Sequence, residues 1–139
     1  MTTNTDNTLS PELFRVIDAN LNRLREGIRV VEDIIRYRDN NKELASQLKK
    51  LRHLARVDEH TELLQNRDSI NDVLRSTTQS ELSRNSIENI ITANFKRAQE
   101  SSRVLEELYK LTNPQYSETF KHIRYELYDL EKQITLNEK

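Results

Sequence analysis

Apolar residues recur at helical spacing in the first third of the chain. The stripe consists of Ile17, Leu21, Leu24, Ile28, Val31 and Ile35, which are spaced by four, three, four, three and four positions. That spacing places all the side chains on one face of a helix. Ser10 and Pro11 precede the stripe in the order of an N-cap and a first helical residue. The pattern therefore predicts one long helix that begins near Ser10 and ends near residues 39–41.

A second apolar stripe predicts a second helix and is formed by Leu44, Leu48, Leu51 and Leu54. No strong breaker follows it, so we expect this helix to continue to Leu63 or Leu64. Residues 65–85 then lose the periodicity and are rich in Ser, Thr, Asn and Asp, which favour caps and turns over helix interiors. We expect one long loop there, of the kind that is functional or mobile in compact domains.

The last third of the chain predicts two more helices. One begins near Ser86 and ends at Leu111, before Asn113 and Pro114. The other runs to the C-terminus with an apolar stripe of Phe120, Ile123, Leu127, Leu130 and Ile134. Residues 1–9 are mostly polar and predict a disordered tail, which leaves residues 10–139 as a single helical domain.

The first and third predicted helices repeat one another at an offset of 74 residues. Eight of 16 aligned positions are identical, where composition alone would give about one. The identical pairs are Ile17 and Ile91, Ala19 and Ala93, Asn20 and Asn94, Arg23 and Arg97, Glu26 and Glu100, Arg29 and Arg103, Val30 and Val104, and Glu32 and Glu106. The fold class that follows is all-α: a four-helix bundle of two duplicated hairpins, residues 10–64 and 86–139, with pseudo-two-fold symmetry and a central loop at 65–85.

A helical wheel with about 100 degrees per residue separates the repeated polar positions. Asn20 and Glu32 fall at opposite edges of the apolar stripe, so each can be partly buried. The outer positions, among them Arg23, are not required for packing within one hairpin. One explanation for their repetition is a ladder of weak surface ion pairs at i,i+3 spacing. The other is a site shared by both halves, in which Asn20 and Arg23 lie near Asn94 and Arg97.

Gly27 stands in the middle of the first predicted helix, where glycine costs about 1 kcal/mol relative to alanine. Its equivalent in the repeat is Ser101, which is also small. A close helix crossing explains this, as does a ligand or an arginine side chain lying over the gap. We favour the crossing.

Composition removes several classes of protein. With one glycine and two prolines, the chain has no Walker loop and no dinucleotide-binding glycine fingerprint. It has no cysteine, so disulfides, thiolate nucleophiles and zinc–thiolate sites are excluded. Its 22 basic and 23 acidic residues nearly balance, which gives no general attraction to nucleic acid or anionic membranes. With no apolar run of membrane length and no basic leader, we expect a cytoplasmic protein.

The predicted loop contains a dense group of reactive side chains at residues 67–72. Arg67 can fork onto a phosphate, and Asp68 and Asp72 can hold Mg2+ through oxygen. Turn and cap chemistry explains the same residues without a ligand, and for a short charged loop taken alone we prefer it. The three histidines lack metal-ligand spacing. The abundant arginines are therefore the best lead, and they favour phosphoryl transfer, which needs mainly cations, a metal and positioning.

Five segments together resemble one family: DANLNRLREGIRVVEDIIRY, LKKLRH, RDSINDV, TANFKRAQESSRVLEELYKL and FKHIRYELYDLEK. Over nearly its whole length after the tail, the chain is similar to the small helical hydroxymethylpyrimidine phosphate kinases of thiamine biosynthesis, which occur alone or fused to thiamine-phosphate synthase. The resemblance implies ATP-dependent phosphorylation of 4-amino-5-hydroxymethyl-2-methylpyrimidine phosphate to the diphosphate, without action on the free alcohol. It implies ATP and Mg2+ as cofactors and contact with thiamine-phosphate synthase, with no nucleic acid or membrane partner; a homo-oligomer stays open.

The resemblance also implies the residues of the site. We assign catalytic roles to Arg67, Arg97 and Asp68, with Asp68 and Asp72 organising Mg2+. The residues expected to bind substrate or nucleotide are Asn20, Arg23, Arg52, Asn94, Lys96, Arg124, Glu26 and Glu100. Leu74 stands where the family's loop has a glycine, so a required left-handed backbone or close phosphate approach there would leave this copy slower, differently loaded or inactive. The alternative function is a non-catalytic helical module that docks on thiamine-phosphate synthase or binds a pyrimidine phosphate.

Overall fold

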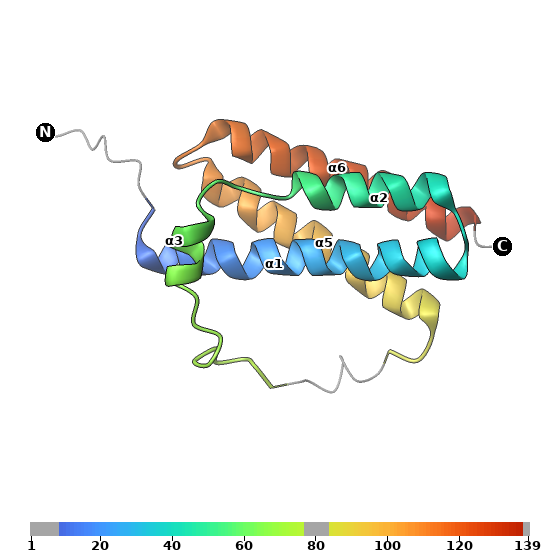
Figure 1. Cartoon of the computed structure of the whole chain (residues 1–139), viewed down its shortest axis with the longest axis horizontal. Coiled ribbons are helices and arrows are strands. Elements are labelled where there is room, and N and C mark those ends of the chain that lie inside the picture. The colour runs from blue at the N-terminus through green and yellow to red at the C-terminus, as the bar shows by residue number, and fades with distance from the viewer. Residues whose placement is uncertain (1–8, 77–83, 138–139) are drawn as a thin grey trace, which may run out of the picture.

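A computed structural model describes residues 9–76 and 84–137 of the chain, and its elements there are helices (Figure 1). Residues 1–8 of the expected tail and residues 77–83 of the expected loop lie outside the described residues. The elements are α1 (Pro11–Asp33), a π-helical turn (Ile34–Arg38), α2 (Lys42–Leu54), α3 (His60–Gln65), α5 (Ile87–Tyr109) and α6 (Pro114–Asn137). The all-α class is confirmed. In the described ranges, no helix combines the length and apolar character needed to cross a membrane.

The helix starts follow the capping residues that the sequence supplies. The Ser10 hydroxyl accepts a hydrogen bond from the Leu13 amide at 3.3 Å, and Pro11 is the first helical residue. The Ser86 hydroxyl caps α5 in the same way, at 3.0 Å from the Asn89 amide. Both predicted starts are confirmed, because a side-chain oxygen satisfies an amide that has no partner within the helix.

The second helix ends nine or ten residues earlier than the sequence analysis predicted. It stops at Leu54, and α3 follows as a separate short helix. Ala55 leaves the helical region, with φ of −80° and ψ of 74°, and both Ala55 and Val57 are buried in the core. Burial of these apolar side chains, rather than a local breaker, therefore redirects the chain.

Four long helices enclose the core. Helix α1 packs against α5 and α2, and α6 packs against α5 and α2; Figure 1 shows α5 crossing α1 at an angle, with its chain direction reversed. The predicted stripe of the first helix is buried except for Leu21, which is half-buried, and Ile17, Leu24 and Ile28 are at 1 % exposure or less. Leu9, assigned to the tail in the sequence analysis, is also buried against the core.

Gly27 lies where α1 and α5 cross. A Cβ atom built on it would stand 3.0 Å from the backbone oxygen of Asn94 and 3.4 Å from the Cβ of Ala98. This confirms the close crossing as the reason for a glycine in the helix centre. The equivalent Ser101 is buried as well.

Candidate functional site

The first half of α1 and the segment after α3 border a cavity of about 550 Å³. Its lining includes five of the residues that the sequence analysis assigned to the site, Asn20, Arg23, Arg67, Asp68 and Asp72. Val16 and Ala19 give it an apolar wall. We call this space the loop cavity.

A second cavity, of about 360 Å³, adjoins the first and shares Asn20 and Arg23 with it. Its other lining residues come from α5 and include Arg97, Glu100 and Ser101. We call it the crossing cavity. Arg23 and Arg97, which the sequence analysis expected to lie close together, both line this one space. Asn94, expected beside them, lines neither cavity. Opposite charges line this cavity, since Glu100 borders it together with Arg23 and Arg97.

The two repeated asparagines make the same local contact. Asn20 Nδ2 donates to the Val16 carbonyl at 2.9 Å, and Asn94 Nδ2 donates to the Ile90 carbonyl at 2.9 Å. Each bond reaches one turn back along its own helix. Asn20 is buried, as the helical wheel predicted for the edge of the stripe, and Asn94 is half-buried.

Two contacts attach the loop to α1. Arg67 donates from Nε and Nη2 to the two carboxylate oxygens of Asp18, both at 2.8 Å, and Arg15 Nη2 donates to the backbone oxygen of Asp68 at 2.8 Å. The hydrogen bond with Asp18 raises the pKa of Arg67. Sequence reasoning missed Arg15 and Asp18. The available signal was a carboxylate at Asp18, beside Ile17 in the apolar stripe.

The carboxylates of Asp68 and Asp72 accept hydrogen bonds within turns of the loop. Asp68 accepts from the Asn71 amide at 3.1 Å and from Asn71 Nδ2 at 2.8 Å, and these bonds lower the pKa of Asp68. Asp72 accepts from the Leu74 amide at 2.9 Å. Both carboxylates thus make contacts of the kind that turn and cap chemistry predicts. Within the described ranges no group of three His, Cys, Asp or Glu side chains is arranged to hold a metal ion.

Two repeated carboxylates form buried ion pairs inside the hairpins. Arg52 donates to both oxygens of Glu32, at 2.6 and 3.1 Å, and joins α2 to α1. Arg124 donates from Nε and Nη2 to Glu106, at 3.1 and 2.9 Å, and joins α6 to α5. Hydrogen bonds to Tyr128 and Glu106 raise the pKa of Arg124. The structure thus places Arg52 and Arg124, both expected to bind substrate, in helix-to-helix pairs; neither lines the two cavities.

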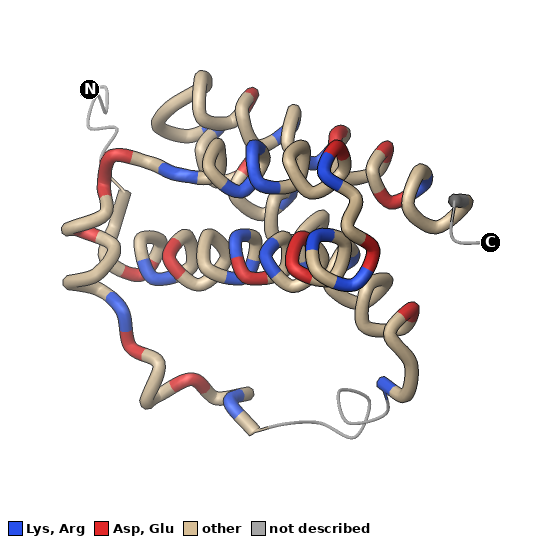
Figure 2. Tube along the Cα trace, turned by 45° about the vertical axis from the view of Figure 1, so that its right-hand side comes forward, with Lys and Arg blue, Asp and Glu red and all other residues tan. Residues whose placement is uncertain are grey.

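The remaining assigned residues lie on the exposed sides of α1 and α5. Lys96 Nζ reaches Glu131 of α6 at 3.5 Å, and Glu26 is exposed. The explanation by a surface ladder covered Arg23, Glu26, Arg29 and Glu32. Its last step does not form, because Arg29 pairs with Asp33 at 3.2 Å and Glu32 pairs with Arg52. Figure 2 shows basic and acidic residues mixed along α1.

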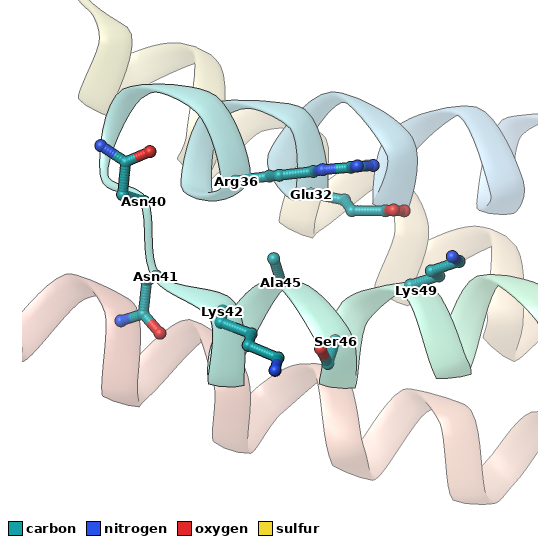
Figure 3. A pocket seen from close by; sticks show the side chains of 8 residues that line it. All are labelled: Glu32, Arg36, Asn40, Asn41, Lys42, Ala45, Ser46 and Lys49. Atoms are coloured by element: carbon teal, nitrogen blue, oxygen red, sulfur yellow. The ribbon is translucent and has the colours of Figure 1, made fainter.

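Another cavity, of about 320 Å³, lies at the opposite end of α1. Figure 3 shows Glu32 and Arg36 on the α1 side and Lys42, Ser46 and Lys49 on the α2 side. Glu32 is the one assigned or repeated residue in it, and that carboxylate is taken by Arg52. The sequence-derived site residues therefore gather at the other end of α1, around the loop cavity and the crossing cavity.

Comparison with protein families adds an assignment to this geometry. The model of the ThiD2 family matches residues 15–133, which cover most of α1 and α6 and all of the elements between them. The chain belongs to the ThiD2 family. No solved structure matches this ThiD2 chain significantly.

Two curated relatives of the ThiD2 chain carry the same name. It is 39% identical over 123 residues to a thiamine-phosphate synthase of Nostoc punctiforme, covering 88% of this chain and 35% of that protein. It is 41% identical over 135 residues to the thiamine-phosphate synthase of Thermosynechococcus vestitus, covering 90% of this chain and 36% of that protein. The chain thus spans about a third of the length of the curated relatives it matches.

Leu74 marks the departure of the ThiD2 chain from the loop glycine expected in the sequence analysis. Among described residues other than glycine, Asn40 alone has a positive φ, of 51°. Leu74 therefore adopts an ordinary backbone conformation, and its side chain is 85 % exposed. Leucine fits this position without strain.

Proposed function

We propose that this ThiD2 chain is a kinase of thiamine biosynthesis that transfers a phosphoryl group from MgATP to hydroxymethylpyrimidine phosphate. The family assignment and the relatives named thiamine-phosphate synthase support the pathway. The resemblance of the five sequence segments supports the reaction. The structural observation that carries the proposal is the meeting of two cavities at Asn20 and Arg23.

The two cavities fit a reaction that joins two anionic substrates. Phosphate groups repel one another, so both must be neutralised before a phosphoryl group can pass between them. Arg15 lines the loop cavity, Arg97 lines the crossing cavity, and Arg23 lines both. Planar guanidinium groups can fork onto phosphate oxygens, which fixes orientation as well as charge. In this proposal Arg23 stands where the two phosphate groups meet.

The residues of the loop cavity also fit a magnesium ion that arrives with ATP. Mg2+ in such sites keeps waters and phosphate oxygens as ligands and needs only one or two protein carboxylates. Asp68 and Asp72 supply two, and the hydrogen bonds from Asn71 lower the pKa of Asp68, which favours its ionised form. When bound, the metal neutralises charge on the transferred group. The chain's own side chains then hold and orient the two substrates.

The chemical step requires little from the protein beyond positioning. An oxygen of the acceptor phosphate bonds to the γ-phosphorus of ATP, while the bond from that phosphorus to the bridging oxygen breaks and leaves ADP. The acceptor is already an anion, so no general base is required. Glu100 lines the crossing cavity and can accept a hydrogen bond from the pyrimidine's amino group.

The duplication belongs to the same proposal. We infer that the two hairpins are related by pseudo-two-fold symmetry within a four-helix bundle. The equivalent asparagine bonds and the equivalent pairs Arg52–Glu32 and Arg124–Glu106 support this relation.

A docking role is a second candidate, favoured by the exposed apolar side chains of the loop. Ile70, Val73 and Leu74 are 78, 93 and 85 % exposed. They can pack on a partner such as thiamine-phosphate synthase. In that case, replacing all three residues by Ser abolishes formation of the complex with thiamine-phosphate synthase in gel filtration. The wild type and the triple variant then both show no ATP turnover.

Turnover of Arg23 variants tests the kinase proposal. Arg23→Lys keeps the charge and loses the fork, so we expect at least a tenfold fall in pyrimidine-dependent ATP consumption with an unchanged melting temperature. Arg25→Lys is the matched control, because Arg25 is exposed on the same helix and lines neither cavity. Equal activity of the two variants would remove Arg23 from the site.

A further inference from the structure

Asp18 stands apart from the duplicated pattern of the chain. Three acidic side chains are buried in the described residues: Asp18, Glu32 and Glu106. Glu32 and Glu106 are equivalent under the 74-residue offset and make equivalent pairs within their hairpins. The equivalent of Asp18 is Thr92. The packing of a hairpin therefore does not require a carboxylate at this position.

The carboxylate of Asp18 is committed to the loop. Both oxygens accept from Arg67, each at 2.8 Å, and Oδ1 also accepts from Asn22 Nδ2 at 3.3 Å. The Asp18 side chain is 9 % exposed and that of Arg67 is 44 % exposed. A two-pronged charged pair has a fixed geometry, so it orients the residues on either side of Arg67. It joins segments 49 residues apart in sequence.

The residues that this pair orients are those of the loop cavity. Asp68 follows Arg67 directly, and its backbone oxygen is held by Arg15, one turn before Asp18 on α1. Asp68 and Asp72 each cap a turn of the loop, so the loop is ordered as a unit from its anchored end. Loss of the anchor at Asp18 would therefore displace both carboxylates from the cavity.

We propose that Asp18 is the positioning residue of this protein, which fixes Arg67 and thereby holds Asp68 and Asp72 at the loop cavity. Arg67 acts as the loop's anchor and not as a phosphate ligand. Thr92 cannot form the charged fork, so the second repeat lacks an anchor and the chain has one phosphoryl-transfer site. This inference rests on the proposed kinase function for its catalytic part, and on the described contacts for its structural part.

Amide hydrogen exchange of the ligand-free chain tests the anchor. Asp18→Asn and Arg67→Gln are each expected to speed exchange of the Asn71 and Leu74 amides at least tenfold, and the double variant no further. The matched control is Asp33→Asn, whose partner Arg29 lies on the same exposed helix side. Wild-type exchange rates in Asp18→Asn, or effects that multiply in the double variant, would overturn the anchor.

Kinetics and binding test the positioning role. In Asp18→Asn we expect the Mg2+ concentration for half-maximal rate to rise at least fivefold and kcat to fall at least tenfold, while Asp33→Asn is unchanged. Normal kcat and Mg2+ dependence of Asp18→Asn, despite faster amide exchange, would overturn the positioning role and leave the Asp18–Arg67 pair a structural one.

Equilibrium dialysis with a non-hydrolysable ATP analogue is expected to give one binding site per chain, and two sites would overturn the single-site inference. An inactive wild type would overturn the kinase function, and exchange would still decide the anchor.

Discussion

The buried ion pair between Glu106 and Arg124 allows a test of whether Arg124 stabilises the fold or binds substrate. Replacing Glu106 by Met keeps the length of the side chain and good helix propensity, but it removes the partner of a buried guanidinium. The Arg124 and Glu106 side chains are only 9 and 7 % exposed. Removing one member of a buried pair costs about 3–5 kcal/mol, because an uncompensated charge remains.

The surroundings of Arg124 place the expected cost of Glu106→Met near the lower end of that range. Its guanidinium lies 4.9 Å from the ring centre of Tyr125, and Nη1 lies 3.4 Å from the hydroxyl oxygen of Tyr128. These contacts retain about 1 kcal/mol of favourable interaction. We therefore expect a loss of about 3 kcal/mol in the free energy of unfolding. For a chain of this size that corresponds to a melting temperature lower by roughly 10–15 °C.

Urea unfolding followed by circular dichroism measures this loss. The double variant Glu106→Met/Arg124→Met removes both charges and is expected within about 1 kcal/mol of wild type. It should also keep at least a third of wild-type turnover, because Arg124 lines neither cavity. Glu107→Met is the control, since Glu107 pairs with Arg103 and Lys110 on the exposed side of α5, where ion pairs contribute little to stability. A Glu106→Met protein as stable as this control, or an inactive but folded double variant, would refute the reasoning.

Three further predictions concern Tyr109, Gly27 and Arg97. Burial and the 2.7 Å bond to Glu59 raise the pKa of Tyr109, so this tyrosine keeps its proton in the native state above pH 10 and loses it in the unfolded chain. The free energy of unfolding therefore falls above pH 10 by about 1.4 kcal/mol per pH unit, and urea titrations of Tyr109→Phe should show a smaller fall. Gly27→Ala should lower the free energy of unfolding by about 1 kcal/mol, because crowding of the Asn94 oxygen outweighs the gain in helix propensity. Arg97→Lys should reduce kcat at least tenfold with an unchanged melting temperature, since Arg97 is exposed and lines the crossing cavity.

Matched variants decide each of these predictions. The same alkaline slope in Tyr109→Phe as in Tyr37→Phe, whose ring is 67 % exposed, would contradict the first. A more stable Gly27→Ala protein would contradict the second. An Arg97→Lys enzyme that keeps full turnover, or that unfolds, would contradict the third.

The sequence predicted the long helices because their signals are local. The stripe from Ile17 to Ile35 and the caps at Ser10 and Ser86 act within one or two turns, so their outcome does not depend on distant residues. The end of α2 was missed because it depends on burial of Ala55 and Val57 by the rest of the fold. That burial is set by tertiary packing and leaves no breaker in the sequence.

The candidate site was predicted in part for a related reason. The repeat brought Arg23 and Arg97 to one place, because two equivalent helices that cross expose equivalent positions. The roles of Arg52 and Arg124 could not be read from a motif, since a guanidinium binds a carboxylate and a phosphate by the same geometry. Asp18 was missed because its partner lies 49 residues away in an irregular segment.

The proposed reaction is tested most directly by following phosphorus during one incubation. The whole chain is mixed with hydroxymethylpyrimidine phosphate, ATP and Mg2+, and the phosphorus nuclear magnetic resonance spectrum is recorded over time. The account predicts that the pyrimidine monophosphate signal is replaced by a diphosphate, with one ADP formed for each diphosphate and no ATP consumed when the pyrimidine is left out. Persistence of the monophosphate and ATP signals in the complete mixture would contradict the kinase function.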